Sequence, residues 1–217
     1  MITINDIRKN KEILNYINQA DYALKEMGFT EHSLPHVENC VAMVTKILKE
    51  LSYSEEEINL AQIAAFMHDI GNVINRIDHA QSGAIMSFRI LDKLGMDAES
   101  ISKIINAIGN HDESTAQPVS AISAALILAD KSDVRRSRVR QIKPSEFDIH
   151  DRVNYAVTKK EIKFKDKEFV LSLEIDLSIC SIMNYFEIFM KRMILCQKAC
   201  EYLKIKFSLI INGTKMI

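Results

Sequence analysis

The stretch AAFMHDIGN, residues 64–72, is the part of the sequence that most constrains the fold. Its first four residues are small or apolar and continue a helix that starts after Ser54, because Ser54 and Glu57 have capping-box spacing. The helix then ends in His68 and Asp69, two ligand-type side chains where a helix meets a loop. Imidazole and carboxylate together suit iron, manganese, zinc or similar divalent ions. The alternative is that His68 caps the helix and Asp69 binds backbone in a turn.

Helical periodicity extends outward from this stretch on both sides. Residues that typically start or end helices, such as Gly28, Ser33, Gly95 and Asp97, divide this periodic region into separate helical segments. Together with the helix after Ser54, about six helices are predicted by residue 138. The other five cover residues 3–27, Thr30 or Ser33 to about Leu51, residues 79–94, residues 97–110, and a segment with Pro118 in its first turn.

The pattern changes near Pro144. Residues 152–164 and 167–176 are rich in Val, Ile, Phe and Thr, which predicts a hairpin with its turn at Lys165-Asp166. Ser178 is expected to open a long helix to about Leu203, followed by a strand in KFSLIING, residues 206–213. The sequence therefore predicts a mainly α protein, with a helical domain over residues 1–144 and a small α+β unit over residues 145–217. The apolar surface of the long helix is wider than one core-facing stripe, so we expect a homodimer through this unit.

Composition sets limits on the class of protein. Of the 217 residues, 47% are hydrophobic and 26% charged, with only 6 Gly and 3 Pro, which excludes a disordered or collagen-like chain. The net charge of -1 does not indicate a nucleic-acid binder. No apolar stretch is long enough to span a bilayer, and the charged start lacks a signal-peptide core, so a cytoplasmic protein without a membrane partner is expected.

The four cysteines, Cys40, Cys180, Cys196 and Cys200, contain no CxxC pair. They are too few for a disulfide scaffold. We expect buried thiols.

Other residues with ligand chemistry lie at predicted helix ends. His36 and His79 fall in the first turns of their helices, and His111 follows the end of another. Asp130 follows a run of small and apolar residues, and a buried carboxylate needs a partner. A metal ion or Lys131 would supply that partner, and a salt bridge with a following arginine is the alternative.

The order His36, His68-Asp69, His79, His111, Asp130 resembles the HD-domain superfamily of metal-dependent phosphohydrolases. The resemblance covers roughly residues 30–140, and its most specific parts are the HD dipeptide and the segment ALILAD that ends at Asp130. It implies an all-α bundle with metal ligands drawn from separate helices.

The resemblance also implies the ligand set. His36, His68, Asp69 and Asp130 match the ligands of one metal site, and His79 and His111 match the added histidines of binuclear members, in which Asp69's counterpart bridges the ions. Two divalent ions per chain are therefore expected. Ligands without a thiolate favour iron or manganese over zinc, with magnesium as a further alternative.

Differences between this sequence and the motifs of known HD subfamilies narrow the range of expected substrates. Adjacent histidines and a GYP motif are absent, unlike the cyclic-di-GMP phosphodiesterases, and no Glu-Asp pair follows His68-Asp69, unlike the guanosine tetraphosphate hydrolases. The spacing is more similar to small HD hydrolases that cut dinucleoside polyphosphates. The similarity of this chain to those small hydrolases does not extend to the C-terminal unit.

The implied reaction is hydrolysis of a phosphoester or phosphoanhydride, with a nucleotide as the expected small substrate and metal-activated water as the nucleophile. The residues expected in catalysis are Asp69, Lys131 and Asp112, the last orienting a histidine or giving a proton to the leaving group. Lys131 and Arg135 are expected to contact phosphate, since a continuing helix puts them and Arg138 on one face.

Two alternatives belong to other classes. One is a nucleotide-sensing or binding module on the same scaffold with little catalysis. The other is a nucleic-acid adaptor using the arginines of residues 135–140, which the near-zero charge and the lack of interleaved aromatics disfavour. His32 is expected at the surface, and His150 in a linker far from the ligands.

Overall fold

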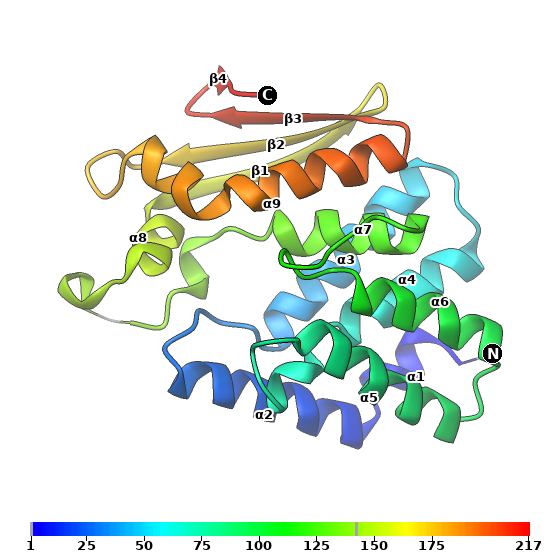
Figure 1. Ribbon diagram of the computed structural model, residues 1–217. Helices are drawn as coiled ribbons and strands as arrows, with labels where there is room; N and C mark the ends of the chain where they lie inside the picture. The colour runs from blue at the N-terminus through cyan, green and yellow to red at the C-terminus, as the bar shows by residue number, and fades with distance from the viewer. Residues whose placement is uncertain (1, 142) are drawn as a thin grey trace.

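The computed structural model describes residues 2–141 and 143–217. The first part is a bundle of helices joined by short turns (Figure 1). Its elements are α1 (Ile4–Arg8), α2 (Lys11–Glu26), α3 (Leu34–Glu50), α4 (Glu55–Met67), the 3₁₀ turn η1 (Ile70–Val73), α5 (His79–Lys93), α6 (Ala98–Gly109) and α7 (Ala121–Lys131).

Local capping explains most of these boundaries. Ser54 and Glu57 form the predicted capping box of α4, and Asp97 accepts a hydrogen bond from the Ser100 amide at the start of α6. Two predictions were wrong. The first predicted helix is divided, because the Asn10 side chain accepts from the amides of residues 12 and 13 and starts a new helix there. Pro118 lies before α7, which begins at Ala121 with Ser120 as its N-cap.

The second part is a four-stranded sheet with flanking helices. Its elements are η2 (Arg136–Arg138), η3 (Pro144–Glu146), α8 (Ile149–Ala156), β1 (Val157–Lys165), β2 (Glu168–Ile175), α9 (Ile182–Tyr202), β3 (Lys206–Ile211) and β4 (Thr214–Lys215). The strand order is β1-β2-β3-β4, with β2 and β3 parallel and the other pairs antiparallel. The helix α9 is the crossover that a parallel pair requires.

The C-terminal elements differ in two places from the prediction. Residues 152–156 are helical instead of strand, because the Asp148 side chain caps α8 by accepting from the Asp151 amide. The long helix begins at Ile182, capped by Ser181, and not at Ser178. No described helix, α9 included, is long and apolar enough to cross a membrane.

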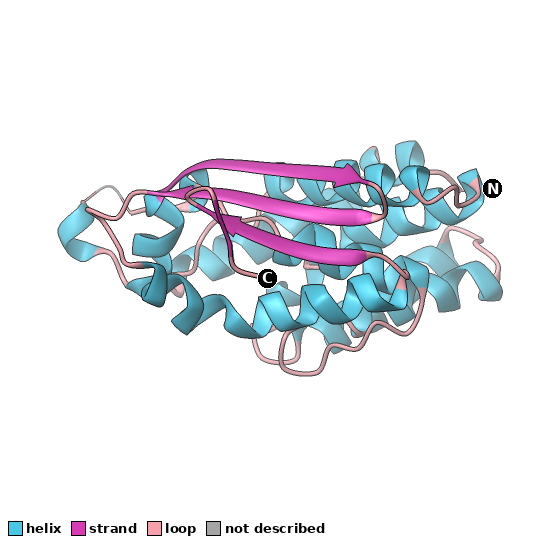
Figure 2. Ribbon diagram, turned by 90° about the horizontal axis from the view of Figure 1, so that it is seen from above, coloured by secondary structure: helices cyan, strands magenta, loops and turns pink. Residues whose placement is uncertain are grey.

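The two parts pack directly on each other. In Figure 1 the sheet is the upper layer and α9 runs below it beside α7, and Figure 2 shows the strands lying across the bundle. The buried core is continuous from the bundle to the sheet and includes β2 residues such as Leu171. All four cysteines are buried and free, as predicted. This packing brings α8 and α9 to the edge of the ligand cluster described next.

Candidate metal centre

The structure brings all six predicted ligands into one buried cluster. They come from the ends of five helices and the turn after α4, and each is at most 9% exposed. The residues are His36 (α3), His68 and Asp69 (end of α4), His79 (α5), His111 (after α6) and Asp130 (α7). The HD dipeptide is therefore central to a cluster and not an isolated helix cap.

The Asp69 carboxylate lies between two pairs of imidazoles. Its Oδ2 is 3.4 Å from His68 Nε2 and 3.7 Å from His36 Nε2. Its Oδ1 is 3.6 Å from His79 Nε2 and 3.8 Å from His111 Nε2. Burial opposes ionisation of Asp69, but electrostatic interaction with the neighbouring His68 imidazole keeps the pKa of Asp69 well below its usual range. Each carboxylate oxygen thus faces one pair, the arrangement that a carboxylate bridging two ions needs.

Asp130 provides the second carboxylate, after that of Asp69, beside the imidazoles of His36 and His68. Its Oδ1 lies 3.4 Å from His36 Nε2 and 4.0 Å from His68 Nε2. Its Oδ2 lies 2.7 Å from Lys131 Nζ, which is also 3.3 Å from Glu113 Oε2. Burial opposes ionisation, but the Lys131 charge holds the pKa of Asp130 well below its usual range.

Backbone carbonyls determine which ring nitrogens carry protons. The Nδ1 atoms of His68, His79 and His111 lie 2.8, 2.9 and 2.6 Å from carbonyl oxygens three residues earlier in the chain. A carbonyl only accepts, so each Nδ1 donates and each Nε2 of a neutral ring keeps a lone pair. His36 Nδ1 donates instead to the Asp133 carboxylate, at 2.9 Å. All four Nε2 atoms point into the cluster, the orientation of histidine metal ligands.

Two features of the Nε2 atoms fit bound cations. His68 Nε2 is buried and has no hydrogen-bond partner among the described residues. The Nε2 atoms of His79 and His111 lie 3.2 Å apart, which sets two lone pairs against each other. Burial lowers the pKa of His68 and of His79 to about 4, so both rings are neutral at pH 7, as ligation requires.

A close backbone approach holds the two halves of the cluster together. A Cβ on Gly71 would lie 2.0 Å from the His79 carbonyl oxygen and 2.5 Å from the Gly83 amide nitrogen. Only glycine at residue 71 lets the first turn of α5 approach η1 so closely. The Gly in the HD-Ile-Gly segment therefore sets the position of His79 relative to Asp69.

Three further predicted residues have different surroundings. Asp112 Oδ1 lies 3.8 Å from His79 Nε2, at the second imidazole pair. The helix α7 ends at Lys131, so the predicted common helical face of Lys131, Arg135 and Arg138 does not form. The Arg135 guanidinium instead pairs with Glu31 at 2.8 Å and with Asp133 at 3.2 Å, and so supports the carboxylate that holds His36.

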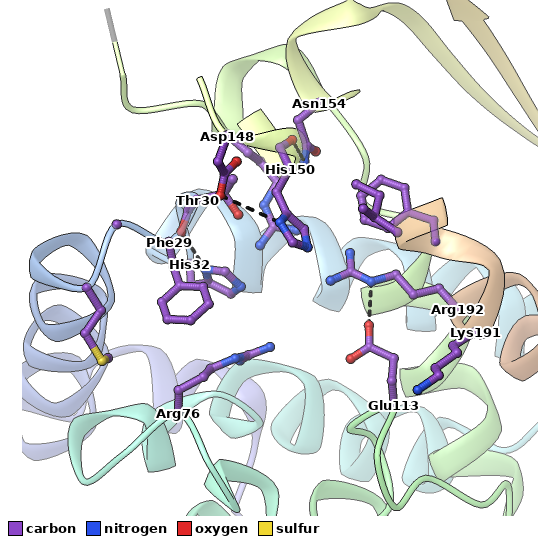
Figure 3. Close-up of a pocket in the computed structure, with 15 residues that line it drawn as sticks. Phe29, Thr30, His32, Arg76, Glu113, Asp148, His150, Asn154, Lys191 and Arg192 are labelled. Atoms are coloured by element: carbon purple, nitrogen blue, oxygen red, sulfur yellow. Dashed lines mark hydrogen bonds and ion pairs between the residues drawn. The ribbon is translucent and has the colours of Figure 1, made fainter. Parts of the chain in front are cut away.

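A cavity of about 480 Å³ adjoins the cluster (Figure 3). Its wall includes Arg76, whose Nη1 is 3.3 Å from His79 Nε2, and Glu113, which pairs with Lys131. Figure 3 shows the guanidinium groups of Arg76 and Arg192 pointing into it. Four cationic side chains line the cavity against two carboxylates. The cations are Arg76, Arg138, Lys191 and Arg192, and the carboxylates are Glu113 and Asp148.

Two histidine predictions were wrong. His32 is buried, with its ring centroid 5.5 Å from that of His36, and it lines the cavity. His150 also lines the cavity, from α8 (Figure 3). The fold places α8 over the mouth of the cavity, which the linear sequence does not indicate.

Other residues of the centre were not predicted from the sequence. Asp133 and Cys40 each lie about one helical turn after a predicted ligand, at spacings of three and four residues, and this spacing was an available signal. Cys40 Sγ is 3.8 Å from His36 Nε2. Glu113 and Arg192, which form an ion pair between the bundle and α9, had no local signal.

Comparisons with known proteins found a family model, a sequence relative and a solved structure that are similar to this chain. The family model described as HD domain matches residues 32–151, which contain all six ligands. An uncharacterised protein of Methanocaldococcus jannaschii is 22% identical in an alignment of 197 residues. The match covers 80% of this chain and 75% of the relative. A solved structure of a predicted HD superfamily hydrolase from an uncultured Thermotogales bacterium shares 23% identity over 62% of this chain and 75% of that one, with a TM-score of 0.47.

Proposed function

This chain belongs to the HD-domain family, a family of metal-dependent phosphohydrolases, and we propose that it hydrolyses a phosphoester or phosphoanhydride of a nucleotide. The observation that carries the proposal is the Asp69 carboxylate, which presents one oxygen to each of two imidazole pairs. We propose two divalent ions per chain, iron or manganese ahead of zinc.

The ligands divide into two sets in this proposal. His36, His68 and Asp130 would hold the first ion, His79 and His111 would hold the second, and Asp69 would be a ligand of both. Ions held in this way lower the pKa of water and neutralise charge on phosphoryl oxygens. The surrounding chain orients the ligands: Asp133 fixes the His36 ring, and carbonyl oxygens fix the other three.

The cavity supports an anionic substrate. Cations exceed carboxylates on its wall, and the arginine fork suits phosphate oxygens. Arg76 is the best placed, because it reaches both the cavity and the second imidazole pair. We therefore assign phosphate contact to Arg76 and Arg192, while the Arg135 guanidinium is held by Glu31 and Asp133. Lys131 acts beside them by neutralising Asp130.

The part of the cavity beside Arg76 supports a nucleobase. Met27 and Phe29 line it and are 49% and 41% exposed, so they offer apolar surface to a ligand. The Arg76 guanidinium lies 5.8 Å from the centroid of the Phe29 ring. A ligand with a phosphate at Arg76 would thus have an aromatic face next to it, and a nucleotide has this combination of groups.

Asp112 has neither of its two predicted roles in this proposal. Burial opposes ionisation, but the hydrogen bond from the Ser114 hydroxyl lowers the pKa of Asp112 below its ordinary value. At neutral pH it is a carboxylate without a proton to give. We therefore propose that Asp112 does not protonate the leaving group. Its Oδ1 lies 3.8 Å from His79 Nε2, which carries no proton because Nδ1 donates to the Arg76 carbonyl, so its negative charge would favour a cation at the second imidazole pair.

The test is metal content of the protein purified without added metal, with a screen of nucleotide phosphoesters. We expect close to two iron, manganese or zinc ions per chain, and loss of metal and activity in Asp69→Asn and His68→Ala. Lys191→Ala, an exposed position on the cavity wall, is the matched variant. It should keep both ions and raise KM.

Two outcomes would contradict the proposal. Absence of metal after incubation with Fe(II), Mn(II) or Zn(II) would leave a binding or structural protein. Full metal content with tight nucleotide binding and no product would favour the nucleotide-sensing alternative.

A further inference from the structure

Cys40 belongs to the surroundings of the first proposed ion. It lies on α3 four residues after His36, so both side chains are on the same face of the helix. The side chain is 0% exposed, and its Sγ lies 3.8 Å from His36 Nε2. Ligand atoms of His36, Cys40, His68 and Asp130 all lie within 4.8 Å of one another.

We propose that the Cys40 thiolate is a ligand of this ion, an inference that rests on the proposed metal binding of the cluster. Ligand atoms that share an ion at about 2.0–2.3 Å are separated by no more than about twice that distance. The observed separations fit this limit: 3.4 Å from His36 Nε2 to Asp130 Oδ1, 3.8 Å to Cys40 Sγ, and 4.0 Å from His68 Nε2 to Asp130 Oδ1.

An independent observation points to a cation at the same place. His68 Nε2 is buried in this group and has no hydrogen-bond partner among the residues that the structure describes. The ligand atom of His68 lies within 4.8 Å of those of Cys40 and Asp130. On binding, the sulfur–metal bond forms and the thiol proton leaves to solvent.

A thiolate changes the metal preference of the first site. The expectation of iron or manganese assumed ligands without sulfur, whereas two imidazoles, a thiolate and a carboxylate form a softer set that suits zinc or Fe(II). The His79–His111 pair has no cysteine near it among the described clusters and keeps a harder set. The two sites of one chain therefore differ. Asp69 would be shared between them, and the softer ion would be held by His36, His68, Asp130 and Cys40.

Cobalt(II) spectroscopy of the full chain tests this assignment. The metal-free protein is titrated with Co(II) as wild type, Cys40→Ser and Cys196→Ser, the last a control for a buried cysteine on α9. We expect near-ultraviolet thiolate-to-cobalt absorption in the wild type and the control. Cys40→Ser should lose this absorption but keep the visible cobalt bands. Its Kd for the first ion should rise at least about 10-fold, the lower limit for removing even a group behind a ligand.

The outcomes separate this inference from the proposed function. Visible cobalt bands without sulfur absorption in the wild type, or equal sulfur absorption in Cys40→Ser, would overturn the Cys40 assignment alone. No cobalt binding in the wild type would overturn metal binding by the whole cluster. The wild-type spectrum decides the question even if Cys40→Ser fails to fold.

Discussion

At the scale of single residues, the centre depends on histidines that are buried and neutral. His68 is fully buried among apolar helix residues, and its Nδ1 proton is used by a backbone carbonyl. A proton on Nε2 would place a positive charge where water cannot reach it. The property that prepares this ring for a cation also makes the folded chain sensitive to acid.

The stability of the metal-free protein should therefore fall as the pH drops from about 6.5 to about 4. The pKa values of His68 and His79 are lowered from 6.5 to about 4 by burial. In this window the unfolded chain takes up protons that the folded chain does not, so acid favours unfolding. For His68 alone the loss is about 3 kcal/mol across the window. Urea unfolding of chelator-treated protein at several pH values measures it.

The other titratable groups of the cluster do not reverse the expected loss of stability as the pH falls. The pKa of His36 is raised despite its burial, with Cys40 and hydrogen bonds to Asp130 and Asp133 as causes, so this ring is already protonated in the folded chain and offsets only part of the loss near pH 6.5. Asp69 and Asp130 have lowered pKa values, so their contribution to the stability of the folded chain is lost only below about pH 3.8. A stability that is flat between pH 7 and 5 would show that these rings are not buried and neutral.

At the scale of elements, the centre is assembled from helix ends. His36 and His79 lie in first turns, and His68 and His111 follow last turns, so small shifts between helices would separate the ligands. The contact of η1 with α5 sets one of these distances, because it joins the turn after Asp69 to the first turn that carries His79.

Gly71→Ala should disrupt this contact. Its Cβ would meet backbone atoms of His79 and Gly83 at 2.0 and 2.5 Å, and backbone cannot move aside as a flexible side chain can. We expect a loss of more than about 4 kcal/mol of unfolding free energy, or no folded protein. Thermal and urea unfolding measure this loss.

Gly109→Ala is the matched control. The added Cβ would lie 3.7 Å from the Ala84 Cβ, an ordinary contact, and residue 109 is helical. We expect a change of at most about 1 kcal/mol, toward stabilisation. Equal effects of the two substitutions would show that the η1–α5 contact has no special role.

At the scale of the whole molecule, the C-terminal unit contributes to the site. Arg192 of α9 pairs with Glu113, which pairs with Lys131, which pairs with Asp130, so the chain of charges runs from the second part of the fold to a proposed metal ligand. The domain boundary predicted near residue 144 therefore crosses a shared core and a shared cavity. The HD match also crosses it, ending at residue 151.

The homodimer stays a prediction. The exposed apolar side chains of α9 indicate which surface would form its interface. Met183, Met190 and Ile194 are 74%, 45% and 48% exposed and recur at spacings typical of one helical stripe. We expect light scattering to give twice the chain mass for the wild type and the chain mass for Met190→Glu with Ile194→Glu. Lys198→Glu, an exposed change on the same helix, should stay dimeric. A monomeric wild type at micromolar concentration would contradict the prediction.

Much of the fold and the ligand set could be predicted from the sequence alone. Caps such as Ser54 and Asp97 act within a few residues, and helical periodicity shows which faces are buried, so helix limits are visible in the linear chain. The cluster of six predicted ligands could be foreseen because each lies beside such a boundary and their order matches one family; their binding of metal stays a prediction. The errors at Pro118 and at residues 152–156 arose where another capping residue competed locally, Ser120 and Asp148.

Only the tertiary structure decided what surrounds the ligands. The partners of Arg135, the burial of His32, and the approach of His150 and Arg192 to the cavity join residues up to about 160 positions apart. Such contacts depend on how the buried faces of helices and sheet pack, which no short window of sequence contains. The sequence by itself determined the chemistry of the ligands, because that follows from residue type and local position. The folded chain determined which charges, apolar surfaces and thiol share that centre, because packing alone brings them within reach.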